Sequence, residues 1–230
     1  MGIVKEYEII LFDVDDTLLD FDISEKNALH KAFLKFGFPK GLADYRPSYN
    51  EISKVLWGDV EQGLISLPEL AVERFKRLFI MHGLDIDAET FSRVYLNYLG
   101  METHLMQGSV ELCKSLADYR LAIITNGFTA VQMARIDNSS LCHTFEHIII
   151  SEKVGSQKPG RPIFDYTFSK LDITDKAKVL IVGDSLSSDI QGGLDYGIDT
   201  CWFNPHYKVN NSEIKPTYEI DKLMELLKIV

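Results

Sequence analysis

The chain has 230 residues, of which 46% are hydrophobic and 25% are charged, a balance typical of a globular protein. This length suits one large domain or a domain with a substantial insertion. The 24 lysine and arginine residues against 34 aspartate and glutamate residues give a formal net charge of −10. Such an acidic chain is a poor partner for nucleic acid polymers and anionic membrane surfaces. Small phosphorylated ligands are not excluded, because a bound metal ion or a few cations can reverse the charge locally.

The three cysteines show no spacing typical of a zinc site or a disulfide framework; they are Cys113, Cys142 and Cys201. The first apolar run is far too short for a membrane span, and no segment resembles a secretory signal peptide. We therefore expect a cytoplasmic protein with free, buried thiols.

Five short apolar runs predict strands that are covered on both faces, because they are continuous rather than alternating and rich in isoleucine and valine. They are residues 7–12, 121–125, 147–151, 179–183 and 200–203. Segments with helical periodicity lie before or between the later runs, at 105–119, 128–137, 162–171 and 187–196. This alternation predicts an α/β fold with a Rossmann-like, doubly wound parallel sheet.

The alternation is interrupted after the first run. Residues 22–103 show helical periodicity at 23–36, 49–62, 68–82 and 87–99, and glycines 37, 63 and 83 lie where helices would end. An insertion of this length is too long for a crossover connection. We therefore predict an α/β core formed by residues 1–18 and 104–230, and an inserted α-helical cap domain formed by residues 19–103.

Acidic residues follow the first apolar run in the segment Asp13-Val14-Asp15-Asp16-Thr17. The carboxyl ends of parallel strands are where such sheets bind ligands. In an extended segment, Asp13 and Asp15 project to the same side, where two carboxylates repel each other unless a cation or a shared proton intervenes. The alternative is an acidic turn that caps a helix.

The segment 183–189, GDSLSSD, follows another apolar run. Its serines suit the N-cap of the next helix, and Asp189 suits that helix's first turn. Asp184 precedes the helix, so we expect it at the same edge of the sheet as Asp13.

Two further elements are weak alone. Thr125 and Asn126 end the second run and open a helix, an arrangement that suits an anion. Lys158 precedes Pro159, and taken alone would be a solvated loop residue. Together, however, these elements bring several carboxylates, a hydroxyl and an ammonium group to one edge of the predicted sheet. Oxygen ligands at this density favour a hard cation, most simply Mg²⁺, with a phosphoryl group as its partner.

The four elements, in this order, resemble the motifs of the haloacid dehalogenase superfamily, in its phosphatase branch with a helical cap. The pattern DxDxT matches residues 13–17, a terminal threonine matches Thr125, the motif lysine matches Lys158, and GDxxxxD matches residues 183–189. Longer stretches resemble the bacterial pyrimidine 5'-nucleotidase-like phosphatases; they are residues 56–70, 124–136, 150–168 and 182–204.

The resemblance implies that Asp13 is the nucleophile and a Mg²⁺ ligand. It implies that Asp15 is the general acid and base, with its backbone carbonyl on the metal. A hydrolytic dehalogenase lacks such an acid because a halide needs no proton, so Asp15 favours a phosphatase.

For the remaining motif residues, the resemblance implies that Thr125 and the N–H of Asn126 hold phosphate oxygens. Lys158 neutralises the nucleophile and the phosphate. Asp184 binds Mg²⁺ directly, and Asp189 either supports the metal through water or holds Lys158.

The resulting hypothesis is a Mg²⁺-dependent phosphomonoester hydrolase with an aspartyl-phosphate intermediate. Its partner is a small phosphorylated metabolite, and nucleoside 5'-monophosphates lead the candidates. A sugar-phosphate or phosphoglycolate phosphatase is the alternative within the same class, and a non-catalytic module that binds phosphorylated metabolites is the alternative from another class. The oligomeric state is left open.

Several other residues are weaker candidates for a ligand site. His143 and His147 have the spacing of a helical zinc pair, but they lead into a strand and lack a third ligand. In the insert, the aromatic residues Tyr45, Tyr49 and Trp57 suit a core better than a base-stacking site. Phe21 is the exception, and we expect it to face the cleft. Arg46 and Arg74 could meet a substrate, although a solvated or salt-bridged position is the simpler expectation.

The segment after Pro216 predicts an amphipathic terminal helix carrying Ile220, Leu223, Leu226 and Leu227.

Overall fold

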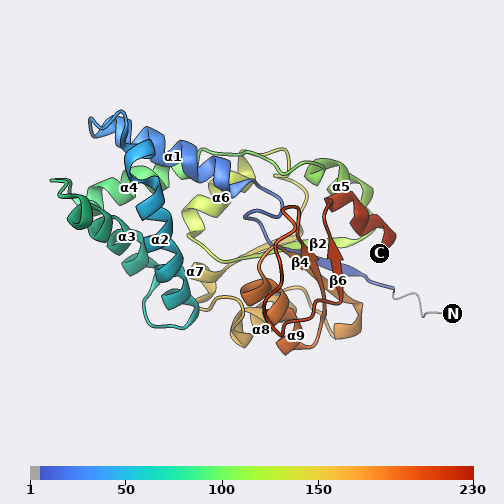
Figure 1. Cartoon of the computed structure of the whole chain (residues 1–230). Coiled ribbons are helices and arrows are strands. Elements are labelled where there is room, and N and C mark those ends of the chain that lie inside the picture. Colours follow the sequence, from blue (N-terminus) through green and yellow to red (C-terminus); the bar gives the residue numbers. More distant parts are fainter. Residues whose placement is uncertain (1–5) are drawn as a thin grey trace. The chain divides into compact units, whose positions relative to one another are not determined.

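The computed structural model describes residues 6–230, so residues 1–5 of the predicted core segment lie outside the described part. Within that part, all strand pairs are parallel and form a single sheet in the order β3-β2-β1-β4-β5-β6. Figure 1 labels β2, β4 and β6 of this sheet. The prediction of a doubly wound α/β fold is confirmed. The strands are β1 Ile9–Phe12, β2 Arg120–Thr125, β3 His147–Ile150, β4 Val179–Gly183, β5 Asp199–Phe203 and β6 Tyr218–Ile220.

The central strand β1 explains why the apolar runs are continuous. Ile10 pairs with Leu121 on β2 and with Leu180 on β4, so β1 is hydrogen-bonded on both sides. Its residues alternate between two separate hydrophobic clusters: Ile10 and Phe12 belong to one, and Ile9 and Leu11 belong to the other. Because both clusters are buried, no position on this strand can be polar until the strand ends.

Helices from different parts of the chain supply these two clusters. The cluster around Ile10 contains residues of α5 (Ser109–Ser115) and of the terminal 3-10 helix η3 (Leu223–Lys228). The cluster around Leu11 contains residues of α8 (Arg161–Lys170) and α9 (Gln191–Tyr196). The other described helical segments that follow the insertion are α6 (Thr129–Asp137), α7 (Ser151–Val154), the 3-10 helix η1 (Lys176–Lys178) and the π-helical turn η2 (Leu186–Ile190).

The prediction of one amphipathic helix after Pro216 was wrong. Ile220 lies in β6, an added edge strand that pairs with β5, and only the residues from Leu223 onward are helical. The apolar spacing correctly predicts that these residues form a buried face, because Ile220, Leu223 and Leu226 are all buried. The open edge of β5 decided the local structure, because pairing satisfies its backbone groups. Leu227, by contrast, is exposed.

The insertion folds into four helices: α1 (Phe21–Lys35), α2 (Gly41–Glu61), α3 (Leu67–His82) and α4 (Ala88–Leu99). Helix α3 begins with a capping box in which Ser66 accepts from the Glu69 N–H, and it ends at Gly83 with φ 62°. Helix α2 begins eight residues before the predicted position and contains Pro47. None of the described helices is long and apolar enough to cross a membrane.

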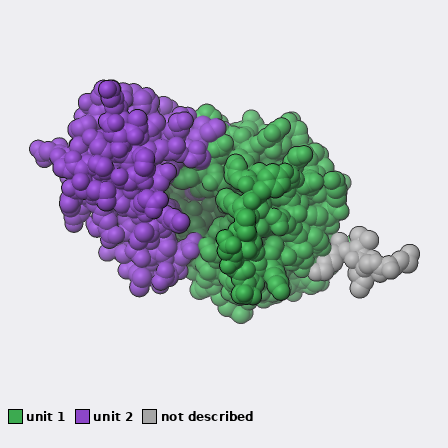
Figure 2. Space-filling view, in the orientation of Figure 1, with its two compact units in different colours: residues 1–21, 104–129, 136–230 green, residues 22–103, 130–135 purple. Residues whose placement is uncertain are grey.

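The described chain divides into two compact units, coloured separately in Figure 2. Unit 1 consists of Met1–Phe21, His104–Thr129 and Ile136–Val230, and unit 2 consists of Asp22–Thr103 and Ala130–Arg135. The short α6 segment belongs to unit 2 through Arg135, which is fully buried and donates from Nε to the Glu102 carbonyl at 3.2 Å.

Candidate active site

The candidate site lies in unit 1, where the central strands end. Asp13 follows β1 directly, Thr125 is the last residue of β2, and Asp184 follows β4 directly. The Asp13 N–H still donates to the Val182 carbonyl of β4 at 2.9 Å, which continues the sheet pairing for one residue. The chain then turns, with three successive N–H groups, those of residues 17–19, donating to the Val14 carbonyl. This turn ends the strand and leaves the Asp13 carboxylate at the sheet edge.

Lys158 is the centre of the site. Its side chain is fully buried, and its ammonium group donates to Asp13 Oδ1 at 2.7 Å, to Asp189 Oδ1 at 2.6 Å and to the Ile124 carbonyl at 2.6 Å. Three donors therefore meet three acceptors. The two carboxylates raise the pKa of Lys158 against the opposing effect of burial, so the ammonium group stays charged.

Asn126 holds the Lys158 backbone in place. Its side-chain Nδ2 donates to the Lys158 carbonyl at 2.9 Å, and its Oδ1 accepts from the Lys158 N–H at 2.9 Å. The adjacent Gly127 N–H donates to Ser151 Oγ at 3.0 Å. The Gly127 N–H, next to the Asn126 N–H that is expected to hold a phosphate oxygen, is therefore engaged within the protein.

Asp189 and Asp184 complete the cluster from β4 and the turn η2. Asp189 is 1% exposed; besides Lys158, its carboxylate accepts from the Ser185 N–H at 3.0 Å through Oδ2. The Asp184 carbonyl accepts from Trp202 Nε1 at 2.8 Å, and its carboxylate faces Lys208 Nζ at 3.2 Å. A cavity of about 570 Å³ opens beside Asp184 and is lined in part by Trp202 and Lys208.

Three carboxylates in this cluster have oxygens within 4.8 Å of one another; they belong to Asp13, Asp184 and Asp189. Burial raises the pKa of Asp13 well above its ordinary value, and Lys158 opposes this rise. Burial, followed by the charge of Asp189, raises the pKa of Asp184 to about 7. Buried carboxylates that repel one another and present only oxygen atoms fit a hard divalent cation such as Mg²⁺.

The remaining predicted residues lie around this cluster. Asp15 is half-buried in the turn after β1, and its charge contributes to the raised pKa of Asp13. Thr17 donates from Oγ1 to Asp13 Oδ2 at 3.4 Å. Thr125 is 1% exposed at the end of β2.

Sequence reasoning missed two features of the site. The reciprocal Asn126–Lys158 clamp joins two predicted residues, but neither spacing nor composition predicts that the side chain of one binds the backbone of the other. Lys208 lies five residues beyond the end of β5, at the same edge of the sheet, and that position was the available signal. The metal-ligand group found among the described residues does not include His143 or His147.

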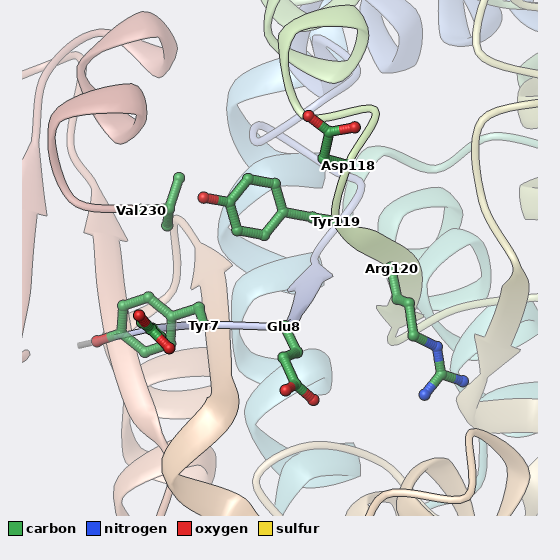
Figure 3. A pocket seen from close by; sticks show the side chains of 7 residues that line it. Tyr7, Glu8, Asp118, Tyr119, Arg120 and Val230 are labelled. Atoms are coloured by element: carbon green, nitrogen blue, oxygen red, sulfur yellow. The ribbon is translucent and has the colours of Figure 1, made fainter.

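A separate cavity of about 590 Å³ lies at the start of β1 and β2, away from these residues (Figure 3). Its lining residues are Glu6, Tyr7, Glu8, Asp118, Tyr119, Arg120 and Val230. The Arg120 guanidinium is already engaged by Glu146 at 2.7 and 2.8 Å and by the Leu171 carbonyl at 2.8 Å. The only cation of this lining therefore has protein partners.

Comparison with known families decides the classification. The family described as haloacid dehalogenase-like hydrolase matches residues 10–203, which spans β1 to β5 and the whole insertion. The chain belongs to the haloacid dehalogenase-like hydrolases. The predicted resemblance is thereby confirmed, as is the prediction that the chain is a hydrolase.

Individual relatives are similar along nearly the whole chain. Pyrimidine 5'-nucleotidase PynA from Streptococcus pneumoniae is 39% identical over 96% of this chain and 94% of its own length. Pyrimidine 5'-nucleotidase YjjG from Escherichia coli is 32% identical over 98% of each chain. Among solved structures, the magnesium-bound HAD-hydrolase YfnB from Bacillus subtilis aligns with a TM-score of 0.92 at 38% identity, over 98% of this chain and 99% of its own.

Proposed function

We propose that this chain is a Mg²⁺-dependent phosphomonoesterase that acts through an aspartyl-phosphate on Asp13 and prefers pyrimidine nucleoside 5'-monophosphates. The observation that carries the proposal is the buried ammonium group of Lys158, held between Asp13 and Asp189, with Asp184 in the same cluster. A nucleophilic carboxylate beside a fixed cation suits attack on a phosphoryl group, because positioning and charge neutralisation carry most of phosphoryl transfer.

Asp13, Asp184 and the backbone carbonyl of Asp15 would hold the metal ion. When bound, the ion supplies positive charge that neutralises the phosphoryl oxygens and screens the carboxylates from one another. Asp189 orients Lys158 through the 2.6 Å contact, so its contribution is to position the ammonium group. Thr125 and the Asn126 N–H are proposed to bind phosphate oxygens.

The proposed reaction has two steps. A carboxylate oxygen of Asp13 attacks phosphorus, the bond from phosphorus to the ester oxygen breaks, and Asp15 donates its proton to the leaving alkoxide. Asp15 then accepts a proton from water as the water oxygen attacks phosphorus, which breaks the bond to Asp13 and releases inorganic phosphate. Asp15 is thereby protonated again, and Asp13 is free for the next cycle.

The nucleotide preference is supported by the names of the relatives PynA and YjjG. We also propose that residues 1–18 and 104–230 act as the catalytic core and residues 19–103 as a cap that sorts leaving groups. Helical insertions of this kind can exclude water and select substrates when they close.

The experiment is a release assay for inorganic phosphate with p-nitrophenyl phosphate, UMP, CMP, dUMP, TMP, purine nucleotides, phosphoglycolate and glucose phosphates, each in Mg²⁺ and in EDTA. We expect metal-dependent turnover that is fastest with the pyrimidine nucleotides and absent in Asp13→Asn. Faster hydrolysis of the sugar phosphates than of every nucleotide would contradict the nucleotidase assignment. Binding of phosphorylated compounds without any metal-dependent turnover would favour a non-catalytic module.

A further inference from the structure

The ammonium group of Lys208 reaches the carboxylate cluster from the loop that follows β5, which takes no part in the proposed reaction steps. Residues 208–212 of this loop line the cavity of about 570 Å³ beside Asp184. Lys208 Nζ donates to Asp184 Oδ2 at 3.2 Å. The carbonyl of Asp184 is held separately, by Trp202 Nε1 at 2.8 Å. The carboxylate can therefore exchange its partner while the backbone of Asp184 stays in place.

A buried asparagine holds the backbone of Lys208. Asn204, which is 4% exposed, donates from Nδ2 to the Lys208 carbonyl at 3.0 Å and accepts at Oδ1 from the Lys208 N–H at 2.8 Å. The chain turns between the two residues at Tyr207, whose φ of 50° lies in the left-handed region that residues other than glycine seldom adopt. A residue that its surroundings hold in such a conformation costs free energy and often marks a functional segment.

Strand β6 fixes this clamp to the sheet. The Asn204 N–H donates to the Ile220 carbonyl at 2.8 Å, and Asn204 Nδ2 also donates to Glu219 Oε1 at 2.8 Å. The Tyr207 hydroxyl donates to Asp221 Oδ2. The edge strand that the sequence did not predict thus supports the turn that carries the lysine.

The Asn204 clamp repeats the arrangement around Lys158. In both cases an asparagine directly after a strand, Asn126 after β2 and Asn204 after β5, binds both backbone groups of a lysine with its side-chain amide. In both cases the ammonium group reaches a carboxylate of the cluster. The side chain of Lys158 is 0% exposed, however, whereas that of Lys208 is 54% exposed. Withdrawing Lys158 would strand a buried charge, whereas Lys208 can turn into water at little cost.

We propose that Lys208 is an exchangeable counter-ion of Asp184: its ammonium group neutralises the carboxylate while the metal ion is absent and gives way to Mg²⁺ when the ion binds. Asn204 is the positioning residue that keeps the ammonium group within reach. This inference rests on the proposed function, because it takes Asp184 to be a ligand of the ion. An oxygen that accepts from an ammonium group has fewer lone pairs for a metal ion, and two cations at one carboxylate repel each other. Lys208 therefore stabilises the metal-free site and lowers its affinity for Mg²⁺.

The exposure of Lys208 sets the size of the effect, because water screens an ion pair of a half-exposed side chain. We expect Lys208→Met to bind Mg²⁺ about 2- to 5-fold more tightly than wild type, and its folding equilibrium constant in EDTA to be lower by a similar factor. In saturating Mg²⁺ the two proteins should unfold at the same urea concentration, because the ammonium group has then left the carboxylate of the wild type.

The test titrates the full chain with MgCl₂ alone in calorimetry and follows urea unfolding in EDTA. Lys215→Met is the matched control, because Lys215 is an exposed residue of the same loop and its substitution removes the same charge. Lys208→Arg keeps the charge and should keep the wild-type affinity. Asn204→Ala should tighten Mg²⁺ binding by itself but not when it is combined with Lys208→Met, because the clamp acts through the lysine.

Equal Mg²⁺ affinities for wild type and Lys208→Met would overturn the inference, and so would weaker binding by the variant. The effect of Lys208→Met on stability in EDTA should disappear in an Asp184→Asn background. An effect that persists there would mean that Lys208 acts through packing and would likewise overturn the inference. Circular dichroism checks the fold of each variant. If Asn204→Ala does not fold, the substitutions of the exposed Lys208 and Lys215 decide.

Failure of this inference is distinguishable from failure of the proposed function. A chain that exchanges Lys208 for Mg²⁺ but hydrolyses no phosphomonoester would refute the proposed function and leave the exchange standing. A chain with metal-dependent turnover whose Mg²⁺ affinity does not respond to Lys208→Met would refute the exchange alone. A chain that binds no Mg²⁺ would refute both.

Discussion

The carboxylate of Asp184 makes the site costly to fold without a metal ion. Its side chain is 19% exposed and lies within 4.8 Å of the oxygens of Asp13 and Asp189. Its one cationic contact that is described is the half-exposed Lys208 at 3.2 Å. We predict that Asp184→Asn stabilises the metal-free protein above neutral pH, because the amide removes a charge that burial and Asp189 disfavour.

The magnitude follows from the pKa of Asp184, which burial raises from 3.8 to about 7. Because this pKa is higher in the folded state, the folded protein binds the proton more tightly than the unfolded chain does. The stabilisation by that proton is fully present below about pH 4 and is lost as the pH rises to about 7. A difference of about three pH units corresponds to about 4 kcal/mol of unfolding free energy.

The assay is urea unfolding in EDTA across this pH range, followed by tryptophan fluorescence. The chain has two tryptophans, and a Trp57→Phe background leaves Trp202, whose indole donates to the Asp184 carbonyl in unit 1. Between pH 4 and pH 8, the unfolding free energy of the protein that retains Asp184 should fall by about 4 kcal/mol more than that of the Asp184→Asn variant. Asp118→Asn, an exposed aspartate of the same unit, is the control and should follow wild type.

Two results would refute this reasoning. Equal unfolding free energies for wild type and Asp184→Asn at pH 8 in EDTA would mean that the ionised carboxylate costs nothing in the folded state. A wild-type protein that gains no stability from Mg²⁺ at that pH would mean that the cluster does not bind the ion, since a ligand that binds only the folded state must stabilise it.

Three other substitutions test neighbouring parts of the site. Asp13→Asn should abolish phosphate release without lowering the unfolding free energy in EDTA, since it removes one repelling carboxylate; a less stable variant would contradict this. Lys158→Met should lower the metal-free unfolding free energy by about 3–5 kcal/mol, because two buried carboxylates lose their cation; an unchanged urea midpoint would contradict this. Gly183→Ala should cost about 1–3 kcal/mol and weaken Mg²⁺ binding in calorimetry, because the added Cβ would lie 2.2 Å from Asp189 Oδ2; wild-type affinity would contradict this.

The sheet could be predicted from the sequence because burial on both faces leaves a clear trace. All five predicted strands exist, and their ends fall within two residues of the prediction. The sixth strand could not be predicted in this way. Of residues 218–220 only Ile220 is buried, so this segment carries no continuous apolar run. It forms a strand because it pairs with the edge of β5, and no pattern within the segment itself predicts that pairing.

Likewise, the sequence predicts the motif residues that directly follow strands. It does not predict which side chains these residues contact in the folded protein. The position of Asp184 after β4 predicts its place at the sheet edge. The contacts of Lys158 to Asp13 and Asp189 span 145 and 31 residues of sequence. Arg74 shows a different case: it lies four residues after Leu70 and four before Leu78, on the buried stripe of α3, but this spacing does not predict which partners the other three helices place opposite it.

The turn η2 explains how Asp189 can reach Lys158 at all. In this turn the Ile190 N–H bonds to the Ser185 carbonyl, which is the wider spacing of a π-helix. The carboxylate of Asp189 then folds back onto the start of the turn, where it accepts from the Ser185 N–H and occupies the space in which a Gly183 side chain would lie. A glycine at the end of β4 and a widened turn are therefore both needed before the buried ammonium group of Lys158 can have two carboxylate partners. Because the Asp189 carboxylate is held by the Ser185 N–H as well as by Lys158, the ammonium group of Lys158 is positioned against Asp13 by protein groups alone.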